Sequence, residues 1–173
     1  PKTQRLIGRN QDIDKTFATL QRLRRETGAL IHADLIIGLP GDDEADIAEG
    51  FNMLVATGAD EIQVGLLKRL RGTAMAGTLG RELRFDEQAP YEVLQTPTLS
   101  FERIQELKRL ARFFDLYYNR GNFPESLPLL WQTAPSCFAA FTAFADFLWH
   151  SEQRTHKLPL ERLAQRLYEH LVS

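Results

Sequence analysis

The stretch Leu30-Ile31-His32-Ala33-Asp34-Leu35-Ile36-Ile37, followed by Gly38-Leu39-Pro40-Gly41, decides the fold. Its first eight residues form a nearly continuous apolar run, which is typical of a strand buried on both faces. The glycines and the proline that follow indicate a turn. The sequence therefore predicts a buried strand over 30–37 that is interrupted by one acidic residue, Asp34.

A helical pattern lies on each side of this strand. Asp12 can cap a first helix that ends near Gly28, and Asp42 or Asp43 can cap a second that ends at Gly58. The apolar residues of both helices recur at three- and four-residue steps: Ile13, Phe17, Leu20 and Leu23 in the first, and Ile47, Phe51, Leu54 and Val55 in the second.

The segment from Glu61 to Leu67 reads as a second strand. Residues 12–67 thus alternate helix, strand, helix and strand with short loops, which predicts parallel strands with right-handed crossovers. Two strands are too few to close a sheet, so we expect an exposed edge on this part of the chain.

The chain changes character after Gly72. Residues 73–99 are rich in glycine, proline and charge, which predicts a loop-rich connection with room for one short helix. Ser100 can cap a long helix that runs to about Asn119. An aromatic helix over about 138–148 and a last helix over about 160–171 follow.

The predicted fold class is therefore α/β followed by all-α. The expected organisation is the last strand–helix units of a partial barrel over 1–72, a connecting segment over 73–99 and a helical C-terminal domain over 100–173. Because the numbering begins at Pro1, without Met and inside a helix-like pattern, we expect an excised fragment.

Composition narrows the classes of function. A net charge of −2 gives no basic face for nucleic acid, and no apolar stretch is long enough for a membrane span. The single cysteine, Cys137, excludes a disulfide framework and fits a cytoplasmic setting. His150 and His156 are six residues apart, which does not place them on one helical face as a metal pair.

Two segments carry a resemblance to a known family. Gln4-Arg5-Leu6-Ile7-Gly8-Arg9 and, beyond a helix, Ala33-Asp34-Leu35-Ile36-Ile37-Gly38-Leu39-Pro40-Gly41 resemble the later part of the radical S-adenosylmethionine core. The similar branch includes the oxygen-independent coproporphyrinogen oxidases, and the 25-residue separation of Arg9 and Asp34 (34 − 9) agrees with it.

Later segments resemble a narrower group, which joins a cobalamin-binding domain and a radical core to a helical C-terminal domain of unknown function. The segments that carry this likeness are Gln63-Val64-Gly65-Leu66-Leu67-Lys68-Arg69-Leu70-Arg71-Gly72-Thr73, Tyr91-Glu92-Val93-Leu94-Gln95-Thr96 and Phe114-Asp115-Leu116-Tyr117-Tyr118-Asn119-Arg120-Gly121.

The resemblance implies cofactor-binding roles for Arg9, Asp34, Gly38 and Gln63. The planar guanidinium of Arg9 can grip the α-carboxylate of S-adenosylmethionine through two hydrogen bonds, and Asp34 can accept hydrogen bonds from ribose hydroxyls. A buried Asp34 would also need such donors. The alternatives are a plain surface role for Arg9 and a structural hydrogen bond to a backbone amide for Asp34.

Other conspicuous residues have structural interpretations. Asp42 is interpreted as a helix cap, and His32 as a structural residue on the same strand face as Asp34. Cys137 is interpreted as a buried, inert thiol. The stripe from Phe138 to Phe147 is interpreted as core.

The three-cysteine loop that ligates the family's 4Fe–4S cluster is absent from this sequence. We therefore expect the fragment itself to be inactive and to bind none of the parent's cofactors tightly. In the parent, the resemblance implies S-adenosylmethionine, the iron–sulfur cluster and reductive cleavage, with cobalamin as a further cofactor of the narrower group.

The expected partners are the N-terminal part of the parent chain and an unknown substrate, with neither nucleic acid nor membrane. The fragment would contribute a wall of the S-adenosylmethionine site and a helical cover. Two alternatives stand beside this hypothesis. One is a helical protein-interaction module on an α/β support, and the other is a piece of an unrelated α/β barrel.

Overall fold

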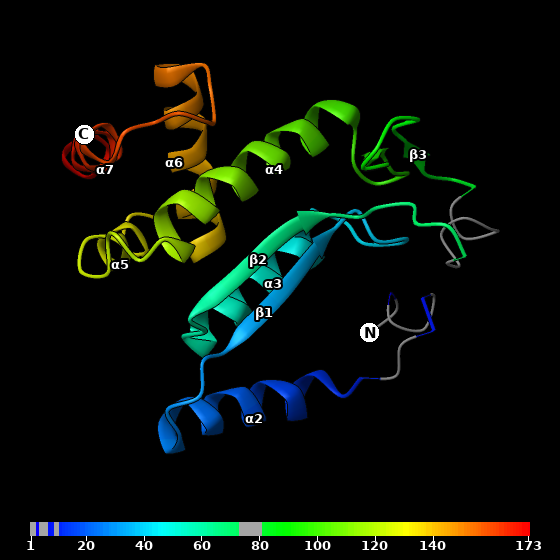
Figure 1. Ribbon diagram of the computed structural model, residues 1–173, viewed down its shortest axis with the longest axis horizontal. Coiled ribbons are helices and arrows are strands. Elements are labelled where there is room, and N and C mark those ends of the chain that lie inside the picture. The colour runs from blue at the N-terminus through cyan, green and yellow to red at the C-terminus, as the bar shows by residue number, and fades with distance from the viewer. Residues whose placement is uncertain (1–2, 4–6, 9–10, 73–80) are drawn as a thin grey trace.

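The computed structural model of the protein describes residues 3, 7–8, 11–72 and 81–173 (Figure 1). Arg9 lies outside the described residues, and so does segment 73–80 of the predicted connection.

The first half alternates helix and strand as predicted. Its elements are α2 (Ile13–Glu26), β1 (His32–Ile37), α3 (Glu44–Thr57) and β2 (Glu61–Leu66). Asp12 caps α2, accepting a hydrogen bond from the backbone N–H of Lys15 at 3.0 Å. Gly58 ends α3 in the left-handed conformation, with φ 64°.

The cap of α3 is Asp43, which settles a choice that the sequence left open. The Asp43 side chain accepts from the backbone N–H groups of Ala45 and Asp46, and the Asp46 side chain accepts from the Asp43 N–H in return. The interpretation of Asp42 as the cap is wrong, because this half-buried side chain accepts a hydrogen bond from Thr3 Oγ1 instead.

Strands β1 and β2 form a parallel pair, as the alternation predicted. Their register places His32 opposite Glu61, Asp34 opposite Gln63 and Ile36 opposite Gly65. Among the described residues β1 pairs with no strand except β2. Its second edge is therefore open, as expected.

The two faces of this strand pair differ, and here the prediction of burial on both faces is wrong. Helix α3 lies behind β1 and β2 in Figure 1, and a Cβ added at Gly50 on that helix would lie 3.0 Å from Leu35 Cδ1. On the opposite face His32, Asp34 and Ile36 are exposed. No element of the described chain covers this second face, where Ile36 is 36% exposed.

The connecting segment contains two short strands, whereas the sequence analysis allowed for one short helix there. Within its described part, 81–99, β3 (Arg84–Phe85) and β4 (Val93–Gln95) form a small antiparallel sheet. The Val93 N–H donates to the Leu67 carbonyl at 2.8 Å, and the backbones of Lys68 and Glu92 form an isolated antiparallel β-bridge. The helix expectation fails over 81–99 because this segment bonds to the chain just beyond β2.

The second half is helical, as predicted. Helix α4 (Phe101–Phe114), capped by Ser100, continues as the π-helix η3 (Asp115–Asn119). After the short α5 (Leu127–Leu130) come α6 (Cys137–Glu152) and α7 (Leu160–Val172). Helix α4 and η3 run beside β2, whereas α7 lies at the periphery against α5 and α6 (Figure 1).

Aromatic rings join the two halves into one core. Phe51 of α3 contacts Phe114 and Phe138, with ring centroids 4.9 and 5.7 Å apart. Phe114 in turn packs edge-on against Phe141 at 5.1 Å. The interpretation of the phenylalanine stripe as core is confirmed, since Phe138, Phe141 and Phe144 are all buried.

None of the helices in the described ranges combines the length and the apolar character that a membrane crossing requires.

Candidate functional site

The uncovered surface of the β1–β2 pair, which we call the open sheet face, carries most of the described residues that the sequence singled out. Parallel register pairs point to the same side of a sheet, so each pair contributes two adjacent side chains. The open sheet face consists of His32, Asp34 and Ile36 from β1 and Glu61, Gln63 and Gly65 from β2.

Asp34 and Gln63 are register partners at the centre of this face. Both are exposed, so the expectation that Asp34 is a buried carboxylate in need of donors is wrong. Water can solvate Asp34 because nothing in the described chain covers it. The pair presents a carboxylate acceptor beside an amide that both donates and accepts, a set suited to hydroxyl and amine groups.

His32 and Glu61 contact each other at the amino end of the same face. His32 Nδ1 lies 2.9 Å from Glu61 Oε2. A protonated imidazole would make this contact an ion pair, and a neutral ring with its hydrogen on Nδ1 would donate a hydrogen bond to the carboxylate. No partner for His32 could be predicted, because Glu61 lies on the next strand and only the register brings the two together.

Gly38 follows β1 directly but is buried rather than open to the sheet face. Its φ is +88°, and a Cβ there would lie 2.7 Å from Val93 Cγ1. The structure thus gives Gly38 a packing reason for being glycine. Its cofactor-binding role stays a prediction, and so does that of Arg9, whose position the described residues do not include.

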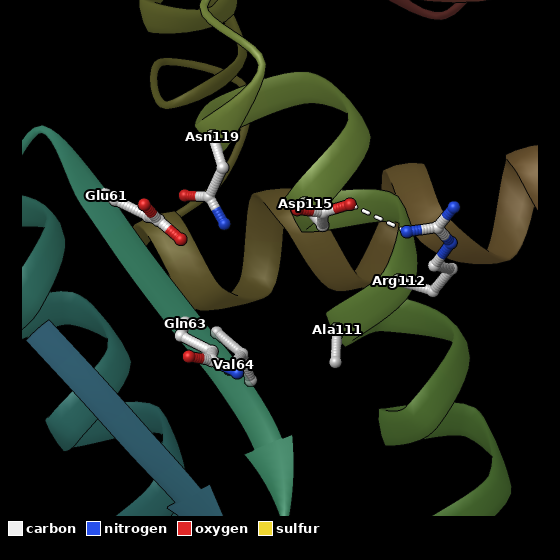
Figure 2. Close-up of a pocket in the computed structure, with 7 residues that line it drawn as sticks. All are labelled: Glu61, Gln63, Val64, Ala111, Arg112, Asp115 and Asn119. Carbon is white, nitrogen blue, oxygen red and sulfur yellow. Dashed lines mark hydrogen bonds and ion pairs between the residues drawn. The ribbon is translucent and has the colours of Figure 1, made fainter. Parts of the chain in front are cut away.

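A cavity of about 370 Å³ adjoins the open sheet face where β2 meets α4 and η3 (Figure 2). Arg112 Nη1 donates to Asp115 Oδ2 at 2.7 Å along the helical wall, and Arg112 extends away from β2. Glu61 and Gln63 belong to both the cavity and the open sheet face. The cavity lining is Glu61, Gln63, Val64, Ala111, Arg112, Asp115 and Asn119.

The side chains of Tyr117, Tyr118 and Asn119 form hydrogen bonds to the backbone of β2, of the loop before it and of α7. Asn119 accepts from the Ile62 N–H at 3.0 Å and donates to the Ile62 carbonyl at 3.1 Å, as a neighbouring strand would. Tyr118 donates to the Ala59 carbonyl at 2.7 Å, and Tyr117 to the Leu163 carbonyl at 2.9 Å. In the sequence these residues stood out only through their resemblance to a known family. In the structure each of them forms a side-chain hydrogen bond to the backbone of another segment.

The two hydrogen bonds of Asn119 cover the outer edge of β2 at Ile62. An unpaired edge strand invites association with other strands, and the Asn119 amide satisfies both backbone groups of Ile62. Burial also raises the pKa of the Tyr117 and Tyr118 hydroxyls, so both remain neutral donors at neutral pH.

Asp42 and Cys137, which lie away from the sheet face, both have raised pKa values. Burial is the largest influence on Asp42 and raises its pKa, against the opposing hydrogen bond from Thr3. Burial likewise raises the pKa of the half-buried Cys137 thiol, in line with an inert cysteine. A protonated thiol is a poor nucleophile and a poor metal ligand.

The residues present do not fit an iron–sulfur cluster. Such clusters are held by several thiolates, and Cys137 is the one cysteine of the sequence. Within the described ranges, no three His, Cys, Asp or Glu residues gather as a metal site would require. The open sheet face does fit the polar parts of a nucleoside, through Asp34 and Gln63.

Comparison with known proteins gives both a relative and a family. The chain is similar to Protein YhcC of Escherichia coli strain K12 and to Uncharacterized protein YhcC of Escherichia coli O157:H7. Each is 36% identical over 78 residues, which are 43% of this chain and 24% of the relative. The similar region thus spans about a quarter of each relative's length.

The family model described as "Protein of unknown function (DUF4080)" matches residues 82–173. This range begins before β3 and includes α4, η3 and every later helix. It supplies the helical wall of the cavity, whereas β1 and β2 lie outside it. Because the match covers more than half of the 173 residues, the chain belongs to the DUF4080 family.

Proposed function

We propose that this chain is part of a radical S-adenosylmethionine iron–sulfur enzyme, in which it forms one wall of the S-adenosylmethionine site and a helical cover. The observation that carries the proposal is the open sheet face. A parallel strand pair has its helix on one side only, and the uncovered side presents Asp34 next to Gln63.

The asymmetry of the two faces supports this role. In barrels of parallel strands the helices lie outside and the inward side chains come from alternate residues. The open sheet face is the one opposite α3, so it would be the inner surface of such a barrel. Polar side chains there require either water or a ligand as their partner.

The roles of the chain's own residues follow from their chemistry. Asp34 would accept hydrogen bonds from ribose hydroxyls, Gln63 would bond a polar edge of the ligand, and Arg9 would hold the α-carboxylate. S-adenosylmethionine held there would supply the group that abstracts hydrogen, with methionine as the leaving group and the electron coming from a reduced cluster outside this chain. The cluster ligands would come from elsewhere in the parent protein, since this sequence holds only Cys137.

The helical half would act as the cover. Helix α4 and η3 lie along β2, and the cavity they share with it opens beside Glu61 and Gln63. The match of residues 82–173 to a family of unknown function fits the narrower group, which carries a helical domain of unknown function. Cobalamin is a cofactor of that group, and none of the described residues argues for a cobalamin site in this chain.

The test uses the full-length parent protein, purified without oxygen. Iron and sulfide content is measured first, followed by reductive cleavage of S-adenosylmethionine to 5′-deoxyadenosine. Arg9→Ala, Asp34→Ala and Gln63→Ala should each lower cleavage at least about tenfold, the loss expected from one good hydrogen bond to a charged or polar ligand. Cluster content should stay unchanged.

Asp14→Ala is the matched control for Asp34→Ala, because Asp14 is an exposed aspartate on α2, away from the open sheet face. It should cleave like the wild type. A cluster and normal cleavage in all three site variants would refute the residue roles and leave the enzyme class standing. A parent protein that assembles no cluster would refute the enzyme class.

A second candidate is a helical protein-interaction module supported by the α/β half. The observation that favours it is a set of exposed apolar side chains on α7, which lies away from the open sheet face (Figure 1). This candidate predicts association through α7 and normal behaviour when Asp34 or Gln63 is replaced.

A further inference from the structure

Asn119 links the helical half of the molecule to β2. Its side-chain amide accepts a hydrogen bond from the Ile62 N–H at 3.0 Å and donates one to the Ile62 carbonyl at 3.1 Å. Glu61 and Gln63, the residues on either side of Ile62, both belong to the open sheet face. The one amide therefore acts on β2 directly between its two polar side chains.

The two hydrogen bonds of Asn119 act on the two peptide groups that flank Ile62. The Ile62 N–H belongs to the planar peptide group shared with Glu61, and the Ile62 carbonyl belongs to the group shared with Gln63. The Glu61 N–H donates to the Ile31 carbonyl at 3.2 Å, so Glu61 is held from the side of β1 and Ile62 from the side of η3. Because each peptide group is planar, the bond to the Ile62 carbonyl restricts the orientation of the backbone that carries Gln63.

The Ile62 side chain anchors this part of β2 from the opposite face. It is completely buried, whereas Gln63 points to the open sheet face, as the alternation along a strand requires. Gln63 lies there opposite Asp34, its register partner. The place of the Gln63 amide relative to Asp34 therefore depends on how the backbone at Ile62 is held.

The segment that presents Asn119 is itself anchored. Asn119 is the last residue of η3, and π-turns that continue an α-helix occur frequently at functional sites. The preceding residues Tyr117 and Tyr118 donate to the carbonyls of Leu163 and Ala59 at 2.9 and 2.7 Å. A group that positions a binding residue has to be fixed by bonds of its own in this way. The Asn119 amide meets that requirement.

We propose that Asn119 is a positioning residue for the S-adenosylmethionine wall and that it acts through Gln63. By holding Ile62 it keeps the Gln63 amide in the direction in which a hydrogen bond to the ligand is strong, since such bonds weaken steeply when they are bent. This role rests on the proposed function and goes beyond that of a cover. Residues 82–173, which match the family of unknown function, contain Asn119 but not Gln63. The helical half thus shapes the ligand wall from outside it.

A double-mutant cycle on the full-length parent protein, purified without oxygen and with its cluster content measured, tests this role. The measurement is the dissociation constant of S-adenosylmethionine by equilibrium dialysis. Gln63→Ala should raise this constant about tenfold, and Asn119→Ala should raise it at least about threefold. Asn119→Ala made in the Gln63→Ala protein should add less than about twofold, because the residue through which Asn119 acts is already gone.

Tyr117→Phe is the matched control. Tyr117 lies in the same π-helix and loses one side-chain hydrogen bond to a carbonyl, but that bond runs to Leu163 of α7 and not to β2. This variant should bind S-adenosylmethionine within about twofold of the wild type. Circular dichroism checks that every variant is folded. Should Asn119→Ala not fold, Asn119→Asp replaces it in the cycle, because Asp accepts from the Ile62 N–H but cannot donate to the Ile62 carbonyl.

The possible results separate this role from the proposed function. Less than about twofold further loss from Asn119→Ala in the Gln63→Ala protein supports the positioning role. If Gln63→Ala weakens binding and Asn119→Ala alone does not, the positioning role is wrong and the proposed function stands. A further loss as large as that in the wild type would mean that Asn119 does not act through Gln63, which also overturns it. Normal binding by Gln63→Ala, or a parent protein without a cluster, would remove the proposed role of Gln63 or the enzyme class, and the positioning role with it.

Discussion

At Gly38 a single missing side chain lets two segments approach each other. The backbone there has φ +88°, which costs a residue with a Cβ about 1–2 kcal/mol. The added Cβ would also lie 2.7 Å from Val93 Cγ1, on a strand that is 55 residues later in the chain (93 − 38). The packing of the connection against the first strand therefore depends on this glycine.

Gly38→Ala should consequently lower the free energy of unfolding by about 2–4 kcal/mol, from strain and overpacking together. Urea denaturation followed by circular dichroism measures it. Gly65→Ala is the matched control, because a Cβ at Gly65 meets nothing within 4 Å. A Gly38→Ala protein as stable as the Gly65→Ala protein would show that Val93 is not in close contact with Gly38.

Asn119 acts at the same scale, since one amide satisfies both backbone groups of Ile62. Asn119→Leu leaves a buried N–H and a buried carbonyl without partners, which should cost about 2–4 kcal/mol of unfolding free energy. Asn122→Leu, the same change at an exposed asparagine, should alter stability by less than about 0.5 kcal/mol. Equal urea midpoints for the two variants would contradict the role assigned to Asn119.

At the scale of elements, the boundaries and types of the long helices follow from local chemistry. Asp12 and Ser100 cap α2 and α4 because their side chains satisfy free N–H groups next to them in sequence. Strands β3 and β4 escaped prediction because they are only two and three residues long. Pairs of that length exist through their partners rather than through their own pattern.

The contact between α6 and α7 includes a histidine, His170, whose pKa is lowered by burial. The His170 ring lies 5.0 Å from the Phe144 ring and 5.2 Å from the Phe147 ring, and burial lowers its pKa from 6.5. The folded state thus favours neutral His170, whereas the unfolded chain takes up a proton as the pH falls below about 6.5.

Stability should accordingly be fully present above pH 6.5 and decline as the pH falls through the lowered pKa of His170. Urea midpoints measured from about pH 8 to pH 5 follow this decline across the usual titration range of histidine. His170→Gln cannot take up that proton, so its curve should be flatter than that of the wild type over the same range. Parallel curves would mean that His170 is not desolvated in the folded protein.

At the scale of the whole molecule, the buried apolar residues of the described ranges form one hydrophobic core. Phe51 of α3, Phe114 of α4 and Phe141 of α6 belong to a single cluster of buried residues. Both tryptophans, Trp131 and Trp149, lie in the helical half. Loss of packing in the α/β half should therefore lower the urea midpoint reported by the fluorescence of the two tryptophans in the helical half.

Phe51→Leu should lower the unfolding free energy by about 1–2 kcal/mol, because a smaller side chain leaves part of the cluster unfilled. Tryptophan fluorescence and far-ultraviolet circular dichroism should shift together to the same lower urea midpoint. If fluorescence kept its wild-type midpoint while circular dichroism shifted, the two halves would be independent folding units.

The candidate site divides in the same way between local and long-range causes. The sequence marked Asp34 and Gln63 correctly as members of two strands, and the structure places them side by side on one face. It also predicted burial for Asp34, which failed because the length of an apolar run does not reveal whether both faces find a cover. Glu61, Arg112, Asp115 and the cavity they line were not predicted at all, since they come from segments about 50 residues apart (112 − 61).

The sequence by itself determined the alternation of helix and strand, the parallel pairing, the caps of α2 and α4, and the aromatic core. Those features depend on side-chain periodicity and on hydrogen bonds between residues a few positions apart. Only the tertiary structure decided which face of the strand pair is open, which aspartate caps α3, and how Asn119 closes the edge of β2. Each of these features depends on which distant segment packs on a surface or supplies a hydrogen-bond partner. The local sequence pattern does not specify that segment.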